Sequence, residues 1–131
     1  MLTPTFSDGQ DRTTFAPFVL RDCRDTDYPN VNLQFSDHDW REQHIGDDHI
    51  GDYYLNGYGI QGLVIAARQL AGLEPIADGM EPDSEGDTCL IYFTDLDMAI
   101  ETACLAHAMI HDPAQRSACA ALAADEGYDD I

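Results

Sequence analysis

The chain contains no lysine, and this absence excludes several kinds of chemistry. Without lysine there is no Schiff-base nucleophile and no lysine of a phosphate-binding P-loop. The only basic side chains are six arginines, and they stand against 25 acidic residues, which leaves a net charge of −19. Such a charge repels phosphate backbones and anionic lipid surfaces, so we expect neither nucleic acid nor a membrane as a direct partner.

Long apolar runs are also missing. No run approaches the roughly 18 residues that a membrane-spanning helix needs, and the first residues show no basic start or apolar core of a signal peptide. We therefore expect a cytoplasmic protein. Four cysteines occur without a CxxC pair, which argues against a zinc knuckle. We expect buried free thiols, and a disulfide or a reactive thiol is the alternative.

Catalytic signatures are absent as well. There is no GxSxG, no glycine-rich phosphate loop and no Cys–His–Asn arrangement. With so many carboxylates, any single acidic pair carries little information about acid–base catalysis. We expect no enzymatic activity and no cofactor.

At 131 residues and 44% hydrophobic composition, the chain has the size and content of one globular domain. Residues 1–14 are polar and are predicted to form a loosely held arm before a single domain at 15–131. Apolar patterns predict strands at 15–21, 31–35 and 89–93, the first two as a hairpin and the last buried on both faces. Helical spacing, with its caps, predicts helices at 60–73, 96–111 and 114–125.

Two segments between these elements are polar: 36–52 is predicted to be irregular, and 74–87 is predicted to be an acidic loop. Because strands and helices do not alternate regularly, the order favours an α+β fold. We expect a small antiparallel or mixed sheet with about three helices packed on one face.

The most unusual composition lies between residues 37 and 58, where aromatic residues mix with acids. Aromatic side chains supply contact area, and acids attract a basic partner. We predict a partner-binding surface formed by Asp37, Asp39, Trp40, Glu42, Asp47, Asp48, Asp52, Tyr53 and Tyr54. The alternative is that the aromatics belong to the core and the acids only solvate the surface. An acidic, lysine-free surface also fits a protein adapted to concentrated salt, and composition alone does not distinguish these cases.

Histidines near these acids raise a metal-binding alternative. The available ligands are His38, His44, His49, Asp47, Asp48 and Asp52, but their spacing matches no known zinc arrangement. His107 and His111 share a predicted helix face without the glutamate of a zincin motif. The acids at 78–87 do not follow the order of an EF-hand calcium loop. A metal-binding protein or metal-dependent enzyme centred on 38–52 is the second hypothesis.

Three short motifs in the second half carry a family resemblance. They are Tyr54-Leu55-Asn56-Gly57-Tyr58-Gly59, continuing as Gln61-Gly62-Leu63-Val64; Glu81-Pro82-Asp83-Ser84-Glu85-Gly86-Asp87; and Thr94-Asp95-Leu96-Asp97 with Ala99, Ala103 and Leu105. With these motifs in this order, about residues 52–125 of the chain resemble one family of immunity proteins from bacterial polymorphic toxin systems, the family numbered fifty-one in that series. Proline in the acidic loop, Cys89 and the Asp-rich segment 37–52 depart from that pattern.

The resemblance implies an antitoxin-like protein that binds and neutralises a cognate toxin domain. It supplies no catalytic residues. Many toxin domains act on nucleic acid through basic clefts, so an acidic domain of this charge suits a nuclease toxin as a mimic of phosphate. Toxins with other targets fit nearly as well.

Overall fold

The centre of the protein is a pair of strands in which apolar residues alternate along the chain. In the computed structural model, which describes residues 1–131, β3 (Val31–Phe35) lies antiparallel to β7 (Cys89–Phe93). The register pairs Val31 with Phe93, Leu33 with Ile91 and Phe35 with Cys89. These six residues are buried on the same face, because successive residues of a strand point to opposite faces.

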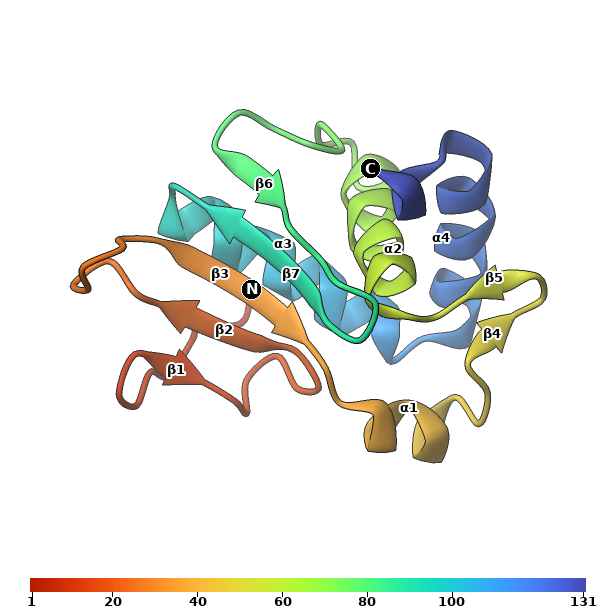
Figure 1. Ribbon diagram of the computed structural model, residues 1–131, viewed down its shortest axis with the longest axis horizontal. Coiled ribbons are helices and arrows are strands. Elements are labelled where there is room, and N and C mark those ends of the chain that lie inside the picture. The colour runs from red at the N-terminus through yellow and green to blue at the C-terminus, as the bar shows by residue number, and fades with distance from the viewer.

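Three more strands extend this pair into a five-stranded antiparallel sheet of order β1-β2-β3-β7-β6 (Figure 1). They are β1 (Gln10–Asp11), β2 (Val19–Asp22) and β6 (Met80–Pro82). Strands β2 and β3 form the predicted hairpin. The strand begins at Val19 rather than Phe15, since Pro17 has no N–H to donate to a ladder and Phe18 closes a turn onto the carbonyl of Phe15.

The predicted helices are confirmed, and they cover one face of the sheet. They are α2 (Gly57–Leu70), α3 (Leu96–Ile110) and α4 (Pro113–Glu126), followed by the 3-10 turn η1 (Tyr128–Asp130). Figure 1 shows α3 behind the strands, with α2 beside it and α4 packed against α2. The α+β class with an antiparallel sheet is therefore as predicted.

Helix boundaries follow the capping residues. Asp95 and Asp112 accept hydrogen bonds from backbone N–H groups at the start of α3 and α4, as their positions in the sequence predict. Helix α2 begins three residues earlier than predicted, because the side chain of Asn56 caps it and accepts from the N–H of Gly59 at 2.8 Å. Gly72 ends α2 in the left-handed region, with φ of 85°.

Both segments predicted to lack regular structure contain some, which corrects the prediction. Residues 36–52 hold the helix α1 (His38–His44) and the first strand of a small hairpin, β4 (His49–Ile50) with β5 (Tyr53–Tyr54). The acidic loop contains β6. These elements are only two to seven residues long, too short to show a period in the sequence.

The prediction that the strand at 89–93 is buried on both faces is wrong. Cys89, Ile91 and Phe93 are buried beneath the helices, whereas Leu90 and Tyr92 are half-buried on the opposite face. No helix covers that second face in Figure 1.

Residues 1–14, predicted as a polar arm, contribute β1 to the edge of the sheet. Asp11 is buried, and the carbonyl of Leu2 lies 3.7 Å from the sulfur of Cys104 on α3. All four cysteines are free, and burial raises the pKa of Cys89 to about 12 and that of Cys119 to about 11. None of the helices has the length and hydropathy required to cross a bilayer.

Candidate functional site

Helix α1 carries the first half of the predicted partner-binding surface. Asp37 caps the helix and accepts a hydrogen bond from the N–H of Trp40 at 3.0 Å. Asp39 and Glu42 are exposed on the same helix. The helix contains no buried residue, so it depends on side-chain anchors to hold it against the domain.

Trp40 is the main anchor, because it is half-buried and touches aromatic rings on three sides. Its ring meets that of Phe35 edge-on, with centroids 6.4 Å apart, and lies 5.4 Å from the ring of His111 at the end of α3. His44 stacks on it at 4.6 Å. Trp40 therefore fits both interpretations of the aromatic residues. It packs against the core, and it remains partly accessible to a partner.

Two copies of the sequence His-Ile-Gly-Asp shape the rest of this surface. In the first copy Gly46, with φ of 81°, follows the end of α1; in the second Gly51, with φ of 59°, turns the β4–β5 hairpin. Positive φ costs glycine little, so each copy changes the chain direction at its third residue. Each change of direction is followed by an exposed aspartate, Asp47 or Asp52.

The side chain of Arg41, which is partly buried, holds the hairpin next to α1. Its Nη1 donates to the carbonyl of Leu55 at 3.0 Å, just after β5, and its Nη2 pairs with Glu42. On the hairpin, Tyr54 is 48% exposed and stacks on His49 at 4.8 Å. The predicted residues of α1 and of the hairpin thus form neighbouring parts of one surface, visible at the lower right of Figure 1.

Tyr53, which was predicted as a contact residue, is buried rather than exposed on that surface. It is only 6% exposed, and its hydroxyl donates to the carbonyl of Gly59 at 2.6 Å. Burial, followed by the negative charge of Asp129, raises the pKa of the phenol far above its ordinary value. Tyr58, by contrast, is 38% exposed at the start of α2.

The arginines do not neutralise this acidity, because most of them bond to neutral groups. Arg41, Arg68 and Arg116 donate to backbone carbonyls, and Arg21 donates to the side chain of Gln34. Of the 25 carboxylate side chains, only Asp22 and Glu42 form an ion pair with an arginine. Most carboxylates therefore have no arginine paired with them.

Three of the six ligands considered for a metal site lie close together in the structure. Asp47, Asp48 and His49 have ligand atoms within 4.8 Å of one another. His38 and His44 are not part of this cluster, since their rings donate to the carbonyls of Asp87 and Trp40. The hydrogen bond with His49 at 2.7 Å lowers the pKa of Asp48 below its ordinary value.

His107 and His111 likewise have a structural role. Both rings donate to the carbonyl of Ala16, at 3.1 and 2.8 Å, and so fix the segment before β2 to α3. The sequence predicted their shared helix face but not their common acceptor.

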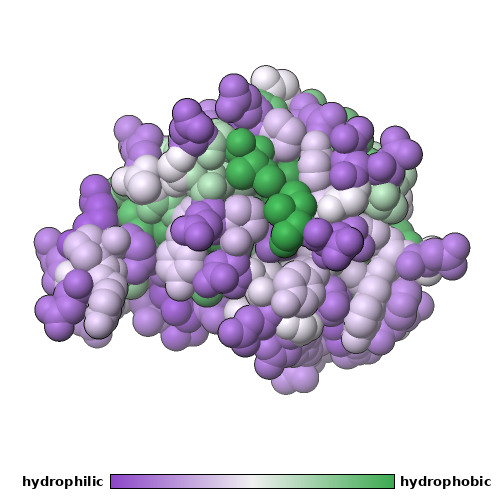
Figure 2. Space-filling model, turned by 45° about the horizontal axis from the view of Figure 1, so that its top comes forward, coloured by the Kyte–Doolittle hydropathy of each residue, from purple (hydrophilic) through white to green (hydrophobic).

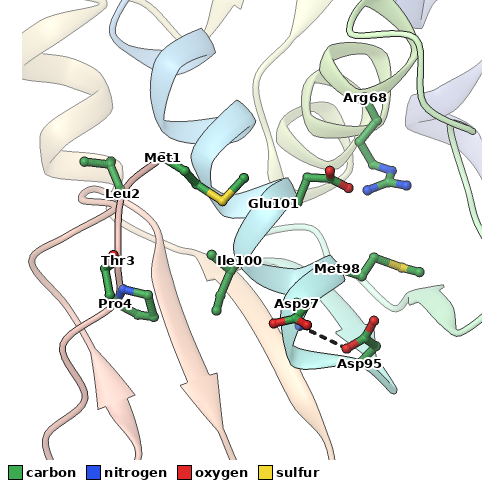
Figure 3. Close-up of a pocket in the computed structure, with 10 residues that line it drawn as sticks. All are labelled: Met1, Leu2, Thr3, Pro4, Arg68, Asp95, Asp97, Met98, Ile100 and Glu101. Atoms are coloured by element: carbon green, nitrogen blue, oxygen red, sulfur yellow. Dashed lines mark hydrogen bonds between the residues drawn. The ribbon is translucent and has the colours of Figure 1, made fainter.

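A cavity of about 540 Å³ lies on the other side of the molecule, between residues 1–4 and α3 (Figure 3). Arg68 reaches it from α2 and is 3% exposed. Its Nε donates to the carbonyl of Glu74 at 3.0 Å and its Nη1 to the hydroxyl of Thr102 at 2.6 Å. In Figure 3 the carboxylate of Glu101 points toward the guanidinium. Arg68 thus joins α2, α3 and the chain after α2.

Hydrophobic surface is scarce by comparison. Figure 2 shows a face that is mostly hydrophilic, with a small hydrophobic patch near its centre. The exposed aliphatic side chains include Leu70, Ile76 and Ile131. Single exposed residues of this kind are common on soluble proteins and identify no interface.

The motifs behind the family resemblance pack the fold together. A Cβ on Gly57 would lie 1.9 Å from the carbonyl oxygen of Glu85, and one on Gly59 would lie 1.8 Å from that of Tyr54. The first glycine brings α2 against the acidic loop, and the second brings it against β5.

The chain has no significant match among protein-family models, curated proteins or solved structures.

Proposed function

We propose that the chain is an antitoxin-like immunity protein that binds a basic toxin domain through its acidic surface and neutralises it without turnover. The observation that carries the proposal is the uncompensated charge: two of 25 carboxylates are paired with arginine. Such a surface attracts a basic partner over several ångströms and raises the association rate. A nuclease toxin fits best, since its phosphate-binding cleft would accept carboxylates in place of phosphates.

The proposed contact surface consists of α1 and the β4–β5 hairpin. It combines the half-exposed aromatic rings of Trp40 and Tyr54 with the exposed acids of both elements. Interfaces commonly place aromatic anchors at the centre and charged residues at the rim. The two elements are short and project from the domain, which leaves them accessible to a partner (Figure 1).

The test is co-expression with the protein encoded next to this chain. We expect that neighbour to inhibit growth of a host when expressed alone, to be tolerated with this chain, and to co-purify with it at low salt. A neighbour that is harmless, or one whose toxicity persists while both proteins are soluble, would refute the proposal.

Two measurements on the purified chain test salt adaptation and metal binding. Circular dichroism at low ionic strength tests salt adaptation, because self-repulsion at −19 should unfold a protein that requires concentrated salt. We expect the fold to persist. Metal analysis of protein purified without chelator tests the Asp47–Asp48–His49 cluster; a full equivalent of one metal would favour the metal-binding hypothesis instead.

A further inference from the structure

A groove separates the β4–β5 hairpin from helix α4 and is distinct from the exposed surface of α1. It has a volume of about 440 Å³. It is lined by residues 50–53 of the hairpin, by small residues of α4 and by Asp129 of η1. Figure 1 shows the hairpin and α4 side by side at the right of the molecule, with η1 beyond the end of α4.

The groove exists because the two walls have no long side chains to fill it. Helix α4 presents one serine and three alanines there, at positions 117, 120, 121 and 124. The opposite wall turns at Gly51, which has no side chain. Beneath them, Tyr53 is held in the core by its hydrogen bond to Gly59, so its ring does not swing out to close the space.

Two carboxylates border this apolar space, and the chain provides no cation for either. Asp52 and Asp129 form no ion pair and accept no hydrogen bond. The one arginine of α4, Arg116, donates to the carbonyl of Ile110 at 2.6 Å. Asp129 lies next to the Tyr53 hydroxyl, since the Cβ position of Gly62 is 3.1 Å from the N of Asp129 and 2.2 Å from that hydroxyl. The charge of Asp129 accordingly contributes to the raised pKa of the phenol.

An apolar floor with carboxylates at its border matches a long cationic side chain. The methylene stem of arginine or lysine packs on apolar surface while its charged head stays with polar groups. A guanidinium also forms short, charge-assisted hydrogen bonds with carboxylates. Neither an anion nor a purely apolar side chain would use both features of the groove.

We infer that this groove receives an arginine side chain of the protein partner, with its stem on Ala120, Ala121 and Ala124 and its guanidinium held by Asp52 or Asp129. The identity of the partner rests on the proposed function, whereas the chemistry of the site does not depend on it. It adds α4 and η1 to an interface that otherwise consists of α1 and the hairpin.

The probe for this site is N-acetyl-arginine amide, titrated into ¹⁵N-labelled protein and followed by amide chemical shifts. N-acetyl-citrulline amide is the matched control, because it has nearly the same shape without the charge. We expect the arginine probe to shift amides of Gly51, Asp52, Ala121, Ala124 and Asp129 in a saturable manner. The citrulline probe should leave them nearly unchanged.

Three variants locate the effect. The double substitution Asp52→Asn/Asp129→Asn should weaken probe binding about ten-fold, since both carboxylates are lost. Asp25→Asn/Asp27→Asn changes the net charge equally in the segment between β2 and β3, and it should leave binding intact. Figure 1 shows the β2–β3 loop at the opposite end of the molecule from the hairpin. Ala121→Leu, at an exposed helix position, should block the groove without unfolding the protein.

Shifts spread evenly over acidic residues, or equal weakening by the two double substitutions, would overturn the groove assignment. These results are independent of the toxin test. If the arginine probe binds here but the neighbouring protein is not neutralised, the groove stands and the proposed function fails. If neutralisation occurs and Ala121→Leu does not affect it or the probe, the groove assignment fails alone.

Discussion

At the residue scale, the clearest example of a charge with a defined structural role is Asp11. It is 1% exposed, and its carboxylate accepts from the N–H groups of Thr5 at 2.8 Å and of Thr13 and Thr14 at 3.0 Å. Burial alone would raise its pKa, but the hydrogen bonds from Thr14, Thr5 and Thr13 outweigh burial and hold the pKa below its ordinary value. A single carboxylate therefore organises most of the segment predicted as a polar arm.

We expect Asp11→Asn to lower the free energy of unfolding by about 1–2 kcal/mol at neutral pH, because an amide accepts these N–H groups less strongly. A carboxyl with a lowered folded-state pKa stabilises the fold above its unfolded pKa and loses this effect as pH falls through the folded pKa. The difference from the parent should therefore shrink toward about pH 3. Urea unfolding at both pH values measures it.

Asp25→Asn is the control, since it removes the same charge from an exposed loop position. It should leave stability nearly unchanged at either pH. A constant difference between Asp11→Asn and the parent across this pH range would show that the carboxylate charge has no special role.

At the scale of elements, helix α2 depends on glycines where other elements cross it. The three glycines at 57, 59 and 62 each face a neighbour that a Cβ would meet at 1.9, 1.8 and 2.2 Å. The first two contacts are with backbone oxygens, which do not move aside as a side chain can. These close approaches explain why the Asn-Gly-Tyr-Gly motif matters to the fold.

Gly59→Ala should lower the free energy of unfolding by about 3 kcal/mol, the upper end of the usual range, because the new methyl group collides with the backbone of Tyr54. Gly86→Ala is the matched control, since nothing lies within 4 Å of its Cβ position. Chemical denaturation of both variants checks the prediction. Equal stability of the two would mean that the approach of β5 to α2 is looser than described.

Helices and strands long enough to show a hydrophobic period, or marked by a capping residue, could be predicted from the sequence. Shorter elements could not. The strand Val31–Phe35 matches its prediction because five residues suffice for alternation. Helix α1 has seven residues and no buried position, so its amphipathic pattern is too short to recognise. Strand β6 is three residues long and exists through pairing with β7 across the acidic loop.

In the candidate site, too, features set by neighbouring residues could be predicted from the sequence, and features set by residues far apart in the chain could not. Composition alone is enough to predict that the acids of 37–52 lie at the surface. Tyr53 and Tyr54 are neighbours with identical side chains, yet one is buried and the other exposed, because β5 alternates its faces. The groove beside α4 could not be foreseen, since it brings residue 52 to residues more than 60 positions later.

At the scale of the whole molecule, net charge and its arrangement make different predictions. A charge of −19 attracts any basic protein at long range, whichever acids carry it. A specific contact surface instead makes the rate depend on which acids are removed. The elongated shape in Figure 1 allows the two effects to be separated, because the β4–β5 hairpin and the β2–β3 loop lie at opposite ends.

The most direct measurement is the association rate with the neighbour-encoded protein for two variants of equal net charge, at several salt concentrations. One replaces Asp47, Asp48 and Asp52 with asparagine; the other replaces the exposed Asp25, Asp27 and Asp78. We predict that the first slows association about ten-fold at low salt and flattens its salt dependence, while the second has a clearly smaller effect. Equal slowing by both variants, or no slowing by either, would contradict a partner-binding surface at α1 and the hairpin.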